Sequence, residues 1–216
     1  DINGNYIDLL NAREDIDKRM IRTVGDPFQR LEEDALRILR AVRFATTLHF
    51  DIDPSLKEAI IEKRDLLKEL SKDRIKMELD RILQDPSGLE WLCKSKLEEA
   101  LELGEFSNVT WVDDIDFCWA QLNWKAYPMS RKKTSKISAI QKLLHQNLSD
   151  PLVLYQTEDE WIRKLAMIKN ISYEELSRKK ELLPIHGTKE IAGSIDGLKQ
   201  KYATYSDKLI YQWWKE

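Results

Sequence analysis

Apolar residues recur at helical spacing along much of this 216-residue sequence, with charged faces between them. The clearest apolar stripe follows Asp26-Pro27, and its members are Leu31, Ala35, Ile38, Val42 and Ala45. Steps of three and four residues place side chains on one face of an α-helix. An aspartate before a proline favours a helix start, because the carboxylate accepts free N–H groups and proline has none to leave unpaired. We therefore predict that residues 31–44 form one buried amphipathic helix.

The same signals predict further helices downstream. Asp53-Pro54 starts one that runs towards Leu67, and Ser71 caps another that buries Ile75, Leu79 and Ile82. After a turn at 85–88, helical periodicity covers residues 91–103, 111–124, 134–147, 158–169 and 172–182. Residues 125–136 hold Pro128 and several cations and are expected to be a basic linker. The predicted fold class is all-α.

Composition narrows the class of protein. Charged residues make up 34% of the chain, and only 7 glycines and 6 prolines interrupt it, which is typical of a helical, soluble protein. No apolar run approaches the roughly 20 residues of a membrane span, so we expect a cytoplasmic protein without a membrane partner. The net charge is only −3, so a nucleic acid would have to bind local basic patches.

The usual catalytic motifs are missing from the sequence. Three Asp-x-Asp pairs occur, but none follows the Gly-Ser turn of a phosphate or metal site, and Asp53 is better explained as a helix cap. The histidines lack metal-binding spacing, and there is no GxxxxGK[ST] or GxGxxG motif. We therefore predict no catalytic residue and no metal ligand in this chain.

The charged residues of the segment 31–44 allow two interpretations. Asp34 and Arg37 lie three residues apart, so on a helix they would be neighbours and could form a solvated ion pair worth tenths of a kcal/mol. Alternatively, an acceptor carboxylate beside a donor guanidinium matches the edge of cytosine or adenine, where an amino donor adjoins a ring-nitrogen acceptor. Guanine and uracil present the reverse order and would leave polar groups unpaired, at roughly 1–3 kcal/mol each.

Several motifs occur together in a fixed order. RTVGDP, EDALR, LRAVRF and a trailing Phe-x-Ile form a set that resembles the neck of class II tRNA nucleotidyltransferases, which are the CCA-adding enzymes and their poly(A) polymerase relatives. Residues 5–25 are similar to the family's hinge motif, and LSKDRIKMELDRIL is similar to a motif that buttresses the templating helix. The resemblance is strong over 1–85, faint over 86–170, and weak again from LPIHGT, where it is similar to the start of the tail.

The resemblance implies roles for individual residues. Asp34 and Arg37 would pair with the base of CTP or ATP, Arg40 would orient or stack near the nucleotide, and Glu33 would hold the helix or Arg37 in place. The implied supporting residues are Asp8 and Arg22 in the hinge and Arg74 and Glu78 in the buttressing motif. The tRNA backbone would contact basic residues of body and tail, for which the best patches are Lys125, Arg131, Lys132, Lys133 and Lys136, then Arg178, Lys179 and Lys180.

The resemblance also implies an organisation and an activity. We expect an elongated, monomeric arrangement with a hinge over 1–25, a neck over 26–85, a body over 86–170 and the start of a tail over 171–216. In the family, Mg²⁺ is bound by a head domain that precedes these parts and whose motifs are not in this sequence, so the chain alone is expected to be inactive. The alternatives are a CC-adding, A-adding or poly(A) polymerase relative, or a non-catalytic helical RNA-binding module.

Overall fold

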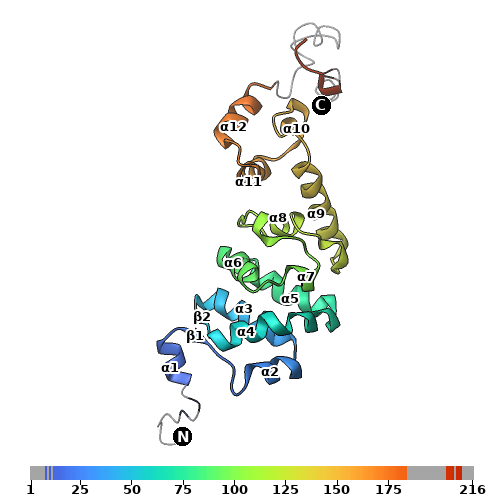
Figure 1. Ribbon diagram of the computed structural model, residues 1–216. Coiled ribbons are helices and arrows are strands. Elements are labelled where there is room, and N and C mark those ends of the chain that lie inside the picture. The colour runs from blue at the N-terminus through green and yellow to red at the C-terminus, as the bar shows by residue number, and fades with distance from the viewer. Residues whose placement is uncertain (1–7, 9, 11, 184–202, 207, 211–216) are drawn as a thin grey trace, which may run out of the picture. The chain divides into compact units, whose positions relative to one another are not determined.

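The computed structural model describes residues 8, 10, 12–183, 203–206 and 208–210, and the chain divides into two compact units, 1–138 and 139–216 (Figure 1). The described residues are mostly helical, which confirms the all-α class, and they add one small sheet that the sequence analysis did not predict. The division at 138/139 falls inside the predicted body. The boundaries of hinge, neck, body and tail stay predictions.

The first unit contains a succession of short helices. In chain order its elements are α1 (Ala12–Asp17), β1 (Met20–Ile21), α2 (Pro27–Glu33), α3 (Leu36–Leu48), β2 (Asp51–Ile52), α4 (Pro54–Lys63), η1 (Arg64–Glu69), α5 (Lys72–Ile82), α6 (Pro86–Lys94), α7 (Glu98–Leu101), η2 (Phe106–Asn108), α8 (Ile115–Ala120) and η3 (Trp124–Ala126). Helix α9 (Arg131–Leu144) begins in this unit.

Aspartate-proline pairs start helices as predicted. Asp26 accepts a hydrogen bond from the N–H of Gln29 at the start of α2, and Asp53 accepts one from Ser55 at the start of α4. The same signal at Asp85-Pro86 starts α6, in a segment for which the sequence analysis expected only a turn. Ser71 precedes α5 as predicted, but its side chain makes no capping hydrogen bond.

The core of the first unit forms around α3. This helix packs against α5 and α6, while α2 packs against α4. Leu31, Ile38, Val42 and Ala45 are buried, which confirms most of the predicted stripe, whereas Ala35 is only half-buried. The predicted continuous helix over 31–44 is wrong, because α2 ends at Glu33 and α3 begins at Leu36.

The two strands fix the segment that leads into α2. β1 pairs in parallel with β2, with Met20 opposite Asp51 and Ile21 opposite Ile52, and both strands contact α3. The N–H of Asp53 also donates to the carbonyl of Ile21 at 2.9 Å. This pairing brings residues 20–22 beside the start of α4, although about 30 residues separate the two strands in the sequence.

The basic segment after Pro128 is helical. The expected linker over 125–136 is therefore wrong for its second half, because α9 begins at Arg131. Lys133 and Lys136 lie in the first two turns of this helix and share a face at i, i+3 spacing. Their direction is consequently set by the packing of α9 within the first unit.

The second unit contains α10 (Pro151–Gln156), α11 (Asp159–Lys169) and α12 (Tyr173–Glu181), and α12 packs against both α10 and α11. Its buried residues include Leu154, Ile162, Leu165 and Leu176. Residues 184–202, which hold most of the stretch LPIHGTKEIAGSIDG that resembles the start of the tail, lie outside the described residues. Among the described helices, none is long and apolar enough to cross a membrane.

Candidate functional site

The turn between α2 and α3 carries the residues that the sequence analysis singled out. The backbone of Asp34 is extended, with φ −153° and ψ 98°, and interrupts the helix between Glu33 and Leu36. An oxygen of the Asp34 carboxylate accepts a hydrogen bond from the N–H of Leu36 at 3.2 Å, and its carbonyl accepts one from the N–H of Arg37 at 3.0 Å. The placement of Asp34 beside Arg37 is thus set by a turn and not by one continuous helix.

The Asp34 carboxylate lies between two arginines from different helices. Its oxygens are 3.7 Å from Nη1 of Arg40 on α3 and 3.5 Å from Nη2 of Arg74 on α5. The Asp34 side chain is about a quarter exposed, and both arginine side chains are about half exposed. Asp34 is therefore electrostatically supported from two sides while part of its carboxylate stays accessible.

Glu78 supplies a buried anchor between α5 and α3. Its side chain is only 9% exposed, and its carboxylate accepts a hydrogen bond from Nε of Arg43 at 2.6 Å. The other oxygen lies 3.8 Å from Nε of Arg40, and the Arg43 guanidinium also stacks over the Phe44 ring at 4.2 Å. Glu78 therefore ties the face of α3 that carries Arg40 to its neighbour α5.

Arg37 is held by a separate set of partners. Its Nη1 donates to the Glu33 carboxylate at 3.0 Å and to the carbonyl of Arg30 at 2.9 Å. Hydrogen bonds from Arg30, and then from Arg37, hold the pKa of the Glu33 carboxyl below its usual value. Arg30 and Arg37 line a cavity of about 350 Å³ together with Thr23 and Val24.

Arg30 was not among the residues predicted from the sequence. A signal was present, because Arg30 lies three residues before Glu33 and would be its neighbour on a helix. The pairing is indeed made within α2, where Nη1 of Arg30 donates to both carboxylate oxygens of Glu33, at 2.9 and 2.8 Å.

The two hinge residues serve the start of the chain and the sheet. The Asp8 carboxylate accepts hydrogen bonds from the N–H groups of Ala12 and Arg13 at the start of α1, at 2.9 and 2.8 Å. Arg22 lies 3.0 Å from an Asp15 oxygen and 3.7 Å from an Asp53 oxygen. Arg22 therefore links α1 to the start of α4.

An open cavity of about 510 Å³ lies next to the hinge residues. Apolar residues of its lining are well exposed, namely Leu10, Val24 and Phe44, with exposed fractions of 60%, 59% and 42%. Polar lining comes from residues that include Asp15, Arg22 and Thr23. The cavity adjoins the site at Arg37, because Thr23 and Val24 line both cavities.

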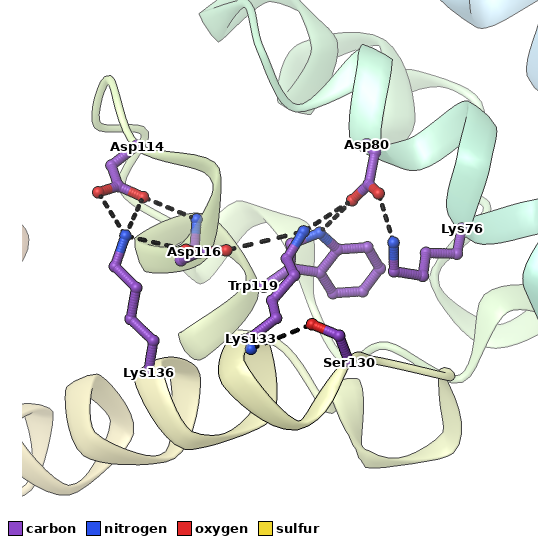
Figure 2. A network of polar contacts seen from close by, with 8 residues as sticks. All are labelled: Lys76, Asp80, Asp114, Asp116, Trp119, Ser130, Lys133 and Lys136. Atoms are coloured by element: carbon purple, nitrogen blue, oxygen red, sulfur yellow. Dashed lines mark hydrogen bonds and ion pairs between the residues drawn. The ribbon is translucent and has the colours of Figure 1, made fainter.

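The basic residues predicted to contact tRNA fall into two groups in the first unit. Lys125, Arg131 and Lys132 are exposed. Lys133 and Lys136 instead join a network of alternating charges between α5, α8 and α9 (Figure 2). The charged members of this network are Lys76, Asp80, Asp114, Asp116, Lys133 and Lys136.

The network surrounds a buried tryptophan. Asp80 accepts a hydrogen bond from Nε1 of Trp119 at 2.8 Å and lies 3.4 Å from Nζ of Lys133 (Figure 2). Nζ of Lys136 lies 2.9 Å from an oxygen of Asp116. Burial by itself lowers the pKa of Lys136, but its hydrogen bonds to Asp116 and Asp114 outweigh that effect and leave the pKa raised. The positive charges of these two lysines are therefore compensated within the protein.

In the second unit, the three cations of α12 that were predicted to contact tRNA also divide into an exposed residue and residues held in ion pairs. Arg178 is exposed, Lys179 pairs with Glu175 at 2.6 Å, and Lys180 pairs with Asp159 at 2.7 Å. Their role in RNA binding stays a prediction. Over the described residues, no three His, Cys, Asp or Glu side chains gather closely enough to hold a metal ion.

Comparisons with known proteins relate this chain to one class of tRNA-processing enzyme. Residues 49–101 match a family described as "Probable RNA and SrmB- binding site of polymerase A". The CCA-adding enzyme of Streptococcus gordonii is 32% identical over 190 residues, which cover 79% of this chain and 42% of that protein. The CCA-adding enzyme of Bacillus subtilis is 41% identical over 101 residues, covering 45% of this chain and 25% of that protein.

The fold agrees with the sequence matches. A crystal structure of the Bacillus stearothermophilus CCA-adding enzyme in complex with CTP aligns with 99% of this chain and 64% of that one, with a TM-score of 0.67 and 24% identity. The chain spans only about half of the length of the curated relatives that it matches. In sequence and in fold, the chain is similar to one part of the CCA-adding enzymes.

Proposed function

We propose that this chain is the nucleotide-selecting part of a CCA-adding tRNA nucleotidyltransferase, and that Asp34 and Arg37 read the base of CTP or ATP. The observation that carries the proposal is the turn between α2 and α3. In this turn the Asp34 carboxylate is partly exposed, and the Asp34 carbonyl accepts a hydrogen bond from the backbone N–H of Arg37 at 3.0 Å. The Arg37 side chain lines a cavity of about 350 Å³. In the intact enzyme, C, C and A would be added to the tRNA 3′ end with release of pyrophosphate.

The chemistry of selection follows from hydrogen-bond complementarity. The Asp34 carboxylate would accept from the exocyclic amino group of cytosine or adenine, and Arg37 would donate to the adjacent ring nitrogen. A guanine or uracil edge would oppose its carbonyl to the carboxylate and its N–H to the guanidinium. Each group left unpaired costs roughly 1–3 kcal/mol, so the preference should amount to about fivefold or more per mismatched group.

The ion pairs around Asp34 and Arg37 support the proposal, because a template must be rigid before the base arrives. Arg40 and Arg74 flank the Asp34 carboxylate without a short hydrogen bond, since their closest approaches are 3.7 and 3.5 Å. The carboxylate therefore keeps acceptor capacity for a ligand. Mg²⁺ would supply charge stabilisation during nucleotidyl transfer, but the described residues offer no fitting ligand set, so we assign it no ligands in this chain.

The test measures selection directly. The chain would be supplied with the head domain of a related CCA-adding enzyme, and addition to tRNAs ending at the discriminator base, at C or at CC would be followed with each of the four nucleotides. We expect Asp34→Ala and Arg37→Ala to lower the preference for CTP and ATP. Two exposed residues of α5 provide matched controls, Asp73→Ala and Arg81→Ala, which should keep it. Normal selectivity in both site variants would refute the template assignment.

The same assay separates the related activities. A CC-adding or A-adding enzyme, or a poly(A) polymerase relative, would differ in which tRNA end and which nucleotide it uses. Without a head domain, we expect the chain to add neither CMP nor AMP to any of these tRNAs. Addition by the purified chain alone would contradict this expectation.

A second candidate function is a helical RNA-binding module without catalysis. The match of residues 49–101 to a probable RNA-binding family and the exposed cations Lys125, Arg131 and Lys132 favour it. Binding to the RNA backbone weakens as salt rises, so tRNA affinity should fall steeply with salt concentration. RNA binding together with a failure of every added head domain to restore nucleotide addition would favour this alternative.

A further inference from the structure

Arg30 on α2 lines the cavity at Arg37 and makes hydrogen bonds to three neighbouring residues. Its Nε donates to the carbonyl of Val24 at 3.0 Å, and its Nη1 donates to both carboxylate oxygens of Glu33. Its own carbonyl accepts a hydrogen bond from Nη1 of Arg37 at 2.9 Å. A single residue thereby joins the loop before α2, the acidic end of α2 and the guanidinium on α3.

The Arg37 guanidinium is fixed through this arrangement. Its Nη1 carries two hydrogens, and the two acceptors that it meets are the Arg30 carbonyl and the Glu33 carboxylate. Among the described residues, no acceptor is recorded for Nε or Nη2 of Arg37, which leaves these donors available to a ligand. The direction in which Nε and Nη2 of Arg37 point therefore depends on how Arg30 and Glu33 are placed.

The loop before α2 is shaped around the same guanidinium. Gly25 has a φ of +84°, a backbone conformation that residues other than glycine adopt only with strain. A Cβ at this position would lie 3.6 Å from Nε and Nη2 of Arg30. Nε of Arg30 donates to the carbonyl of Val24, and Val24 and Thr23 line the cavity together with Arg30 and Arg37. The Arg30 side chain thus holds the loop lining of the cavity and places Glu33, one of the two acceptors of Arg37. The other acceptor is the backbone carbonyl of residue 30, which any substitution there retains.

We propose that Arg30 is a positioning residue that determines nucleotide specificity by holding Arg37 in the orientation that reads cytosine and adenine. The inference rests on the proposed function of Arg37. It assigns Arg30 no contact with the reacting atoms. Its effect should therefore lie in the ratio of correct to incorrect nucleotide, because an Arg37 whose Glu33 acceptor is no longer held in place can turn and donate to the carbonyls of uracil and guanine as well.

The geometry calls for arginine specifically. Contacts with the Val24 carbonyl and with both Glu33 oxygens use the fixed fork of a guanidinium, which a lysine ammonium cannot reproduce. A residue that mattered only through its positive charge would be replaced adequately by lysine. Arg30→Lys is therefore the informative variant, and Arg30→Ala removes both the charge and the fork.

The experiment has two independent readouts. The first is the side-chain Nε–H signal of Arg37 in the nitrogen–proton NMR spectrum of the 216-residue chain without nucleotide, identified by its loss in Arg37→Lys. We expect Arg30→Lys and Arg30→Ala to shift or broaden it, and the control Arg81→Ala to leave it unchanged. The second is the ratio of CTP to UTP incorporation when a head domain is supplied, which should fall about fivefold or more in both Arg30 variants.

The outcomes separate this inference from the proposed function. An unchanged Arg37 signal in folded Arg30→Lys, or a CTP to UTP ratio that lysine fully restores, overturns the role of Arg30. A wild-type chain that shows no preference between CTP and UTP overturns the proposed function, and with it the specificity part of the inference. In that case the NMR signal still decides whether Arg30 positions Arg37.

Discussion

Removal of the Glu78 carboxylate should destabilise the first unit far more than removal of an exposed carboxylate. Glu78 is nearly buried, and its 2.6 Å hydrogen bond to Arg43 joins two charged groups. A hydrogen bond to a charged group contributes about 1.5–3 kcal/mol, and loss of one partner leaves the other charge uncompensated. The contact with Arg40 is longer and half exposed, so it adds at most about 1 kcal/mol.

These contributions predict a loss of about 2–4 kcal/mol in the free energy of unfolding for Glu78→Ala. The value lies at the lower end for buried pairs because Arg43 keeps some exposure and its contact with the Phe44 ring. Glu78→Gln should cost about 1–2 kcal/mol, since the amide oxygen can still accept from Arg43 but carries no charge. Urea unfolding followed by circular dichroism would provide both numbers.

The matched control is Glu90 on α6, which forms an exposed i, i+4 pair with Lys94 at 2.7 Å. Glu90→Gln should cost only about 0.3–0.5 kcal/mol. At about 1 M salt, where charges are screened beyond roughly 3 Å, the small effect at Glu90 should vanish while most of the effect at Glu78 persists. Equal costs for Glu78→Gln and Glu90→Gln, or a Glu78 effect that salt removes, would refute the reasoning.

Two further predictions concern buried groups of the first unit. Burial, with a smaller contribution from the charge of Glu102, raises the pKa of Tyr127, whose hydroxyl donates to the carbonyl of Leu101 at 2.7 Å. The folded protein thus keeps a proton that the unfolded chain releases from about pH 10, so stability is retained below that pH and falls above it. Tyr127→Phe should flatten this loss in denaturation curves at about pH 9 and pH 11. In Gly88→Ala, the added Cβ would lie 2.0 Å from the Ile82 carbonyl oxygen, so we expect a lower melting temperature and a cost of about 2–3 kcal/mol or more.

Each of these two predictions has a clear contrary result. An equally steep loss of stability above pH 10 in Tyr127→Phe would show that other groups carry the alkaline transition. For Gly88→Ala, the comparison is Glu90→Ala, an exposed change on the same helix that should have little effect. Equal melting temperatures for the two variants would show that α6 moves freely away from Ile82.

Local signals in the sequence predicted much of the fold. The buried stripe of α3 and the starts of α2 and α4 depend on residues within a few positions of one another, which is the range over which helix periodicity and capping act. The break at Asp34 was not predicted, since Glu33-Asp34-Ala35 holds no helix-breaking residue. It arises where the Asp34 side chain bonds the backbone at Leu36, an alternative that aspartate offers to a helix.

Long-range contacts decided which charges are available to a ligand. The sequence presents Lys133 and Lys136 as part of one basic patch with Arg131 and Lys132, and nothing local distinguishes them. The structure pairs Lys133 with Asp80, which lies 53 residues away, and Lys136 with Asp114 and Asp116, about 20 residues away. Such pairings depend on how α5, α8 and α9 pack, and no spacing rule along the chain contains that information.

The sequence by itself determined the helical class, most helix starts and the identity of the candidate template residues, because these follow from neighbours in the chain and from an ordered set of motifs. Only the tertiary structure decided how Asp34 and Arg37 are held. Asp34 is supported by Arg74 of α5, and Arg37 is fixed through Arg30 of α2. The physical reason is that a side chain's direction and its remaining hydrogen-bonding capacity depend on the partners that packing brings to it, and those partners come from other helices.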